Sequence, residues 1–218
     1  MSAQVPDNEA IRAAVGDTGS EFYYPALMAR YVRGDSTLTA ADYHHLYYGF
    51  AFQEEYKPLD PVPGENNILS ILETNPQITR DNAEDILAFA SMVMAHDPFS
   101  PSNINFMTYA YGILGDAENE RASARRLENI MAAIGASGTG DKESSPWHVI
   151  FFTHVNDFLA WKGFEPHKRR IVSRSVEYVI PTKADKKNKG FYFDFSRVYW
   201  TPPTKMPEKQ RGGLQPKL

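Results

Sequence analysis

GASGTGDKESS (residues 135–145), followed by WHVIFFTHV (residues 147–155), marks the point where the pattern of the sequence changes. The first stretch is rich in Gly, Ser and Thr and predicts a flexible loop. The second is dense in β-branched and aromatic residues, which is typical of a buried strand. Helical periodicity dominates before this point and strand-like alternation after it. The sequence therefore predicts an α+β fold, in which an N-terminal helical bundle of helix hairpins packs on a small C-terminal antiparallel sheet.

The clearest helical signal outward from this junction lies at residues 39–50. Thr39 and Asp42 have the spacing of a capping box, with Asp in place of the usual Glu or Gln. An aromatic stripe at helical spacing follows: Tyr43, Leu46, Tyr47 and Phe50. Similar reasoning predicts helices over 22–33, 67–73, a long segment after Thr79, 102–114 and 117–134.

On the C-terminal side, residues 170–180 and 191–200 alternate in the manner of strands. The lysine-rich segment 183–189 is expected to join them as a hairpin. In the first strand the mostly apolar set is expected to face inward: Val172, Arg174, Val176, Tyr178 and Ile180. In the second strand Phe191, Phe193 and Phe195 share a face. A short helix is expected over residues 156–162, before this hairpin.

These patterns divide the chain into three parts. Residues 1–20 read as a flexible lead-in, and residues 21–200 as one α+β domain that is helical over 21–135 and β-rich over 147–200. Residues 201–218 are rich in proline and are expected to be a disordered or extended tail.

Composition excludes several classes of protein. The net charge of −4 argues against nucleic acid as a partner, because phosphate binding requires concentrated Lys and Arg. The longest apolar run is too short for a transmembrane segment. The absence of cysteine excludes disulfides, thiol nucleophiles and Cys-ligated zinc. The adjacent His44 and His45 lack the spacing of a helical metal pair, so neither a metal nor a cofactor is expected.

Two stretches resemble a known family. YYPALMARYVRGDSTLTAADYHHLYYGFAFQEEYKPL near the start, and HVIFFTHVNDFLAWKGF followed by GFYFDFSRVYW near the end, resemble a bacterial family known as domain of unknown function number 4919. The resemblance covers most of residues 22–200 and is most specific at LYYGF. It implies no activity, substrate or catalytic residue. Members of that family are commonly predicted to be exported, and Ser2, Ala3 and Gln4 look like the end of a secretory signal peptide. An extracytoplasmic (periplasmic or secreted) location is therefore expected, with a cytoplasmic location as the alternative.

A histidine and carboxylate group carries the main chemical hypothesis. His148 and His154 would share one side of a regular strand, and Asp157 follows where a carboxylate could orient an imidazole. Such a pair could serve as the base and orienting carboxylate of a nucleophilic site. The sequence has no G-x-S-x-G motif that would supply the nucleophilic serine. The structural interpretation is a His154–Asp157 hydrogen bond that caps the short helix, with His154 half-buried.

Tyrosine carries the binding hypothesis. Tyr24 and Tyr48 lie off the helical stripe and could line a groove, because tyrosine is enriched at recognition surfaces. The leading hypothesis is a non-catalytic, exported binding or interaction module with a protein or peptide ligand. The alternatives are a hydrolase that uses His154 and Asp157, and a structural or assembly role.

Overall fold

The computed structural model describes residues 4–183 and 189–200. The helices are α1 (Asn8–Gly16), α2 (Tyr24–Val32), α3 (Ala40–Gly49), the 3-10 turn η1 (Phe50–Phe52), α4 (Glu65–Thr74), α5 (Ala83–His96), α6 (Pro101–Leu114), α7 (Ala117–Ala136), α8 (Thr153–Trp161) and α9 (Ser196–Trp200). The strands are β1 (Trp147–His148), β2 (Pro166–Ile171), β3 (Val176–Pro181) and β4 (Phe191–Asp194). The expectations for residues 201–218 as a tail, and for the signal-like start at Ser2 and Ala3, concern residues outside those that the structure describes.

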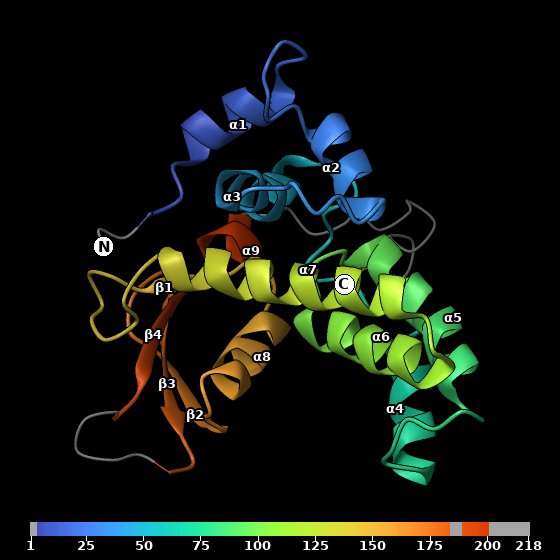
Figure 1. The fold of residues 1–218 in the computed structure, drawn as a ribbon. Helices are drawn as coiled ribbons and strands as arrows, with labels where there is room; N and C mark the ends of the chain where they lie inside the picture. Colours follow the sequence, from blue (N-terminus) through green and yellow to red (C-terminus); the bar gives the residue numbers. More distant parts are fainter. Residues whose placement is uncertain (1–3, 184–188, 201–218) are drawn as a thin grey trace, which may run out of the picture.

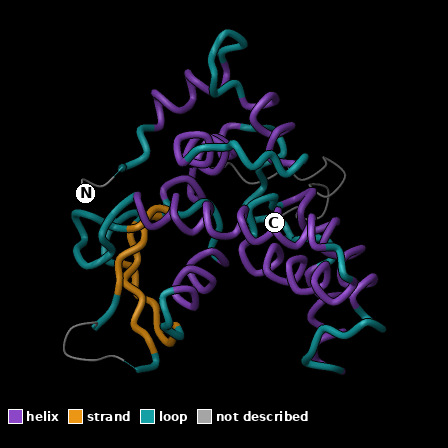
Figure 2. Tube along the Cα trace, in the orientation of Figure 1, coloured by secondary structure: helices purple, strands orange, loops and turns teal. Residues whose placement is uncertain are grey.

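The strands form one four-stranded sheet with the order β1-β4-β3-β2. The hairpin β3–β4 is antiparallel, as is β2–β3, whereas β1 pairs with β4 in parallel, with Trp147 opposite Phe193. The α+β fold is therefore confirmed, and the sheet is mixed because of this one short strand. Figure 2 shows the sheet to one side of a predominantly helical molecule.

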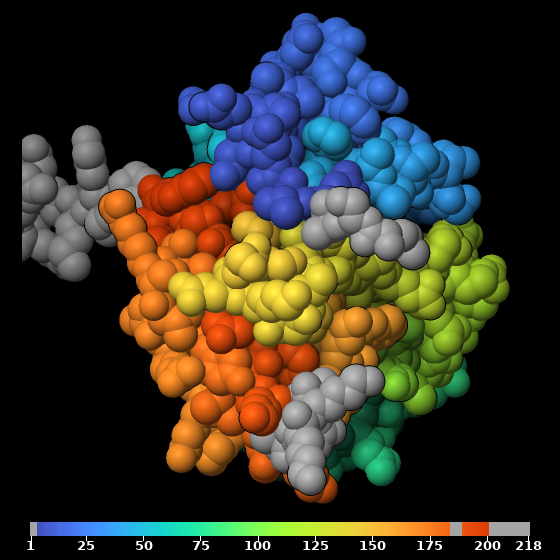
Figure 3. Space-filling view, turned by 90° about the vertical axis from the view of Figure 1, so that its left-hand side faces the viewer, coloured from blue at the N-terminus to red at the C-terminus, as the bar shows by residue number. Residues whose placement is uncertain are grey.

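Helix α7 connects the two sides of the fold. It runs across the middle of the molecule and packs against α3 and α6 as well as against β1 and α8 (Figure 1). Helices α4, α5 and α6 lie on the side away from the sheet, and α1 to α3 lie across the top. The space-filling view of the sheet side shows the N-terminal segment above the C-terminal sheet (Figure 3).

Helix α3 is the centre of the aromatic core. The predicted stripe is confirmed, since Tyr43, Leu46, Tyr47 and Phe50 are at most 4 % exposed. The predicted capping box is also present: the Asp42 carboxylate accepts from Thr39 N–H at 2.7 Å, and Thr39 Oγ1 accepts from Asp42 N–H. Because α1, α2 and α7 all pack against α3, its remaining faces are covered too.

The expected strand over 147–155 was wrong beyond its first two residues. Only Trp147 and His148 pair with β4, and α8 begins at Thr153. Val149, Ile150 and Phe151 are at most 4 % exposed and pack into the core. Val149 N–H still donates to Asp194 O of β4 at 3.2 Å, but the ladder does not continue beyond it. A short buried apolar run has the same sequence signature in both situations.

The expected single strand over 170–180 is interrupted. It contains the end of β2, a tight turn and most of β3, and Val172 N–H donates to Val176 O across the turn. The expected inward face of β3 holds for Val176, which is 8 % exposed, but not for Tyr178 and Ile180, which are partly exposed. Val179 and Glu177 of the other set are buried instead. The predicted face of Phe191, Phe193 and Phe195 is confirmed.

Both ends of the described chain are more helical than expected. Residues 8–16 of the lead-in form α1, capped by the Asp7 carboxylate, which accepts from Glu9 N–H and Ala10 N–H. Residues 196–200 form α9 and not the end of a strand. Asp194 accepts a hydrogen bond from Ser196 N–H at 2.9 Å, and this side-chain contact turns the chain out of β4.

Candidate functional site

His154 lies in the first turn of α8 and is fully buried. Its Nδ1 is 2.8 Å from the Tyr47 hydroxyl, and its Nε2 is 2.8 Å from Oδ2 of Asp97. Asp97 ends α5 and is 3 % exposed. The expected partner, Asp157, was therefore wrong: a helical start at Thr153 directs His154 into the core toward α3 and α5.

The three side chains form one directed hydrogen-bond chain. A carboxylate only accepts, so the imidazole Nε2–H donates to Asp97; when the ring is neutral, Nδ1 accepts from the Tyr47 hydroxyl. Burial raises the pKa of Tyr47 well above its usual value, which keeps the phenol protonated and able to donate. Asp97 is held further by Phe99 N–H at 3.1 Å. We name Tyr47, His154 and Asp97 the buried triad.

The buried triad does not have the geometry of a general base. Both imidazole nitrogens are occupied and the ring has no accessible surface, so a substrate proton could reach His154 only after the core opened. Asp157 instead faces α6 and accepts from Ser102 N–H at 3.3 Å. Burial raises the pKa of Asp157, with the nearby His154 opposing that rise.

His148 belongs to a separate network. Its Nδ1 lies 3.5 Å from Oδ1 of Asp194 on the neighbouring strand. Burial alone raises the pKa of Asp194, but hydrogen bonds from His148 and Ser196 outweigh burial and hold the pKa well below its usual range. The structure therefore brings together neither His148 with His154 nor His154 with Asp157 as a pair.

Tyr48 was expected in a groove and lies in the core instead. It has no accessible surface, and its hydroxyl donates to the carbonyls of Ala133 and His148 at 3.3 and 3.2 Å. The Arg197 guanidinium lies 4.9 Å from the centre of its ring. Tyr48 is buried because other elements cover α3 on several sides, and the sequence of α3 alone does not show that coverage.

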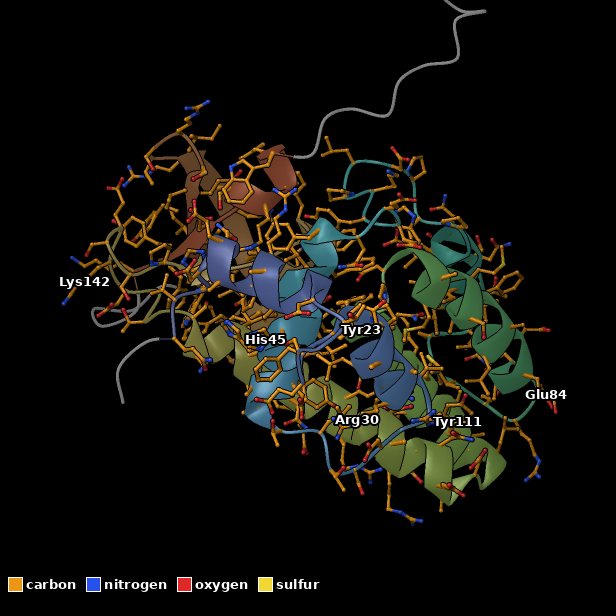
Figure 4. The ribbon with its side chains drawn as sticks, turned by 90° about the horizontal axis from the view of Figure 1, so that it is seen from above. Tyr23, Arg30, His45, Glu84, Tyr111 and Lys142 are labelled. Atoms are coloured by element: carbon orange, nitrogen blue, oxygen red, sulfur yellow. The ribbon has the colours of Figure 1, made fainter. Side chains whose placement is uncertain are left out.

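Tyr24 lies where a binding role is feasible. A groove of about 680 Å³ runs between α2 and the end of α5, and Tyr24 is one of its lining residues. The larger apolar residues of its wall are Tyr24, Met28, Val32, Phe50, Met94 and Pro98. Its polar residues include Arg33, Gln53 and Glu55. We call this feature the α2–α5 groove. Figure 4, seen from above, shows α2 with Tyr23 and Arg30 on this upper side of the molecule.

The Tyr24 hydroxyl is the unusual group of the groove. The residue is 6 % exposed, and the hydroxyl has no hydrogen-bond partner in the described part of the chain. Burial, followed by the neighbouring Tyr31 and Glu55, raises its pKa well above the usual value. Tyr24 therefore presents a protonated donor directly beneath the groove wall, and buried donors are normally paired.

Sequence reasoning did not single out Asp97 or the groove. The only local signal for Asp97 is its position between an apolar helix and Pro98. Its contact with His154 spans 57 residues, which no local pattern reports. Within residues 4–183 and 189–200, no cluster of three or more His, Asp or Glu side chains is arranged to hold a metal ion. In the same residues no helix combines the length and apolar character of a membrane span.

Comparison with known proteins places the chain by family. No curated protein and no solved structure matches it. Residues 9–201 match the family described as domain of unknown function (DUF4919). The match extends from α1 to the end of α9 and includes both the helical part and the sheet. The chain therefore belongs to the DUF4919 family.

Proposed function

We propose that this protein is a non-catalytic binding module whose α2–α5 groove takes an extended peptide segment with apolar side chains. The observation that carries the proposal is the groove itself, an apolar concavity of about 680 Å³ beside an unpaired, buried tyrosine hydroxyl. Ligand pockets in proteins commonly occupy roughly 300–1,000 Å³ and combine apolar walls with a few polar groups.

The lining chemistry favours a peptide. Met28 and Met94 are unbranched and polarisable, so they can adapt to side chains of different shape. Arg33, Gln53 and Glu55 supply both donors and acceptors, which suits a peptide backbone that alternates N–H and C=O. A peptide carbonyl is also the simplest acceptor for the Tyr24 hydroxyl. Val32, a lining residue that is 63 % exposed, keeps part of the apolar wall open to solvent.

The alternatives receive less support from the geometry. A hydrolase that uses His154 and Asp157 would need His154 to bond to Asp157 and to reach a substrate. His154 is fully buried and bonds to Asp97 and Tyr47 instead. A structural or assembly role predicts no peptide affinity at this groove. The same binding experiment therefore separates it from the proposed module.

The test is selection of a random-peptide library on the folded protein, followed by measurement of Kd for the enriched peptides. We expect enriched peptides to be apolar and to lose at least tenfold in affinity on Met28→Glu, which places a charge in the groove wall. The matched control is Ile113→Glu, on an exposed apolar residue of α6 that is not a lining residue of the groove. A thermal melt of each variant checks folding. Selection of no peptide, or equal loss in both variants, would contradict the proposal.

Export is the second part of the proposal. It is supported by the resemblance of residues 22–200 to a family whose members are commonly predicted to be exported. Fractionation of cells that express the natural gene, with detection of the protein by antibody, tests it. Recovery in the cytoplasmic fraction alone would contradict it.

A further inference from the structure

A second cavity, separate from the α2–α5 groove, lies among α4, α5 and α6, with Thr153 of α8 in its wall. It has a volume of about 130 Å³ and shares no lining residue with the groove. The buried triad ends at this cavity, because Asp97 is one of its lining residues. We call it the Asp97 cavity.

The lining of the Asp97 cavity combines polar and apolar residues. Its polar lining consists of Glu65, Asp97, Ser100, Ser102, Asn103 and Thr153. Its apolar lining consists of Val62, Ile68, Leu69, Val93 and Phe106. The exposed Glu65 and Leu69 lie at the solvent side, whereas Asp97 and Asn103 are each 3 % exposed and lie inside.

The charge of the lining has one sign. Two lining residues are acidic, Glu65 and Asp97, and none is Lys, Arg or His. A buried carboxylate is costly unless it is paired, and among the described residues the Asp97 carboxylate has two hydrogen-bond partners, Phe99 N–H and the imidazole Nε2 of His154. Those two contacts fix the orientation of the carboxylate and leave acceptor capacity on both oxygens. The inner end of the cavity is thus prepared for a cationic donor.

Asn103 gives an independent indication of the same ligand chemistry. Its Nδ2 donates to Ala90 O at 3.1 Å, and this contact fixes which end of the amide is nitrogen. Its Oδ1 is buried and accepts no hydrogen bond from the described part of the protein. Since buried polar atoms are normally satisfied, an unused acceptor in the same cavity lining as the Asp97 carboxylate indicates a missing donor.

We propose that the Asp97 cavity binds the ammonium group of a small primary amine with a short apolar chain. The ammonium donates to Asp97 and to Asn103 Oδ1, and the serine and threonine hydroxyls around it supply further acceptors. The apolar chain lies against Val93 and Phe106 and points toward the mouth. The cavity volume limits the ligand to a few carbon atoms beyond the nitrogen.

The test is titration of the protein with n-butylammonium, followed by NMR of the backbone amides of α5 and α6. Butan-1-ol and butyrate serve as neutral and anionic probes of the same length. We expect butylammonium to bind at least tenfold more tightly than butan-1-ol and butyrate not to bind. Equal binding of the amine and the alcohol, or no shift of these amides with the amine, would overturn the proposal.

Variants show where the amine binds. Glu65→Lys reverses the charge at the mouth and should weaken butylammonium binding about tenfold, which corresponds to about 1.4 kcal/mol. The matched control is Glu84→Lys, because Glu84 occupies the first turn of α5 as Glu65 occupies that of α4 (Figure 4). Asp97→Asn should abolish binding, with its melt recorded because it also alters the buried triad. Equal effects of Glu65→Lys and Glu84→Lys would show a nonspecific charge effect and overturn the site.

Discussion

Replacement of His154 by alanine is the most direct test of the buried triad. The change removes both hydrogen bonds of the imidazole and leaves the Tyr47 hydroxyl and one oxygen of Asp97 without that partner in the core. Each buried group left unsatisfied costs about 1–3 kcal/mol, more when it is charged. The space vacated by the ring adds a cavity contribution, since His154 is fully buried.

Together these effects give an expected loss of about 3–5 kcal/mol in the free energy of unfolding. A chain of this size loses roughly 2–4 °C in melting temperature per kcal/mol of lost stability, so the melting temperature of His154→Ala should fall by about 10 °C. Urea denaturation followed by circular dichroism measures the loss directly, and an unchanged m value would show that the unfolded state is the same.

The control for this experiment is His167→Ala, which removes an exposed histidine from β2 and should change stability by less than about 0.5 kcal/mol. Tyr47→Phe removes only the hydroxyl and should cost about 1–2 kcal/mol. A loss for His154→Ala no larger than for His167→Ala would refute the structural role. An increase in stability would instead favour a strained functional histidine.

Two further predictions concern pH and backbone geometry. Burial, aided by His45 and Arg197, lowers the pKa of His44 from 6.5 to about 4. The unfolded chain therefore binds a proton at His44 more readily than the folded chain, so the free energy of unfolding should fall as the pH drops from about 6.5 toward 4. Urea titrations at several pH values measure this dependence, and His44→Gln should reduce it. Gly140 has φ of +69°, and an added Cβ would lie 2.4 Å from the Trp147 ring. Gly140→Ala should therefore lower the free energy of unfolding by more than about 2 kcal/mol. The control is Gly16→Ala, where an added Cβ meets no atom within 4 Å and the same thermal melts should show a small change.

Local patterns in the sequence were sufficient for most of the helices and for one face of the sheet. The capping box at Thr39, the stripe of α3 and the alternation of Phe191, Phe193 and Phe195 depend on neighbours a few residues away, and all three are present. The α+β class follows from the same local periods, 3.6 before the Gly-rich loop and 2 after it. Tyr24, which the sequence suggests as a groove residue, lines the α2–α5 groove, and its binding role stays a prediction.

The tertiary structure decided what those residues contact. The apolar run 149–151 has the sequence signature of a buried strand, because burial makes any segment apolar. Only the structure shows that the β1 ladder ends at His148 and that these residues pack into the core. His154 bonds to Asp97 and Tyr47, which are 57 and 107 residues away, although Asp157 is nearer in sequence. The Asp97 cavity is likewise assembled from α4, α5, α6 and α8. The sequence alone determined the periods and caps of single elements, whereas the partners of buried polar groups depended on which elements folding brought together.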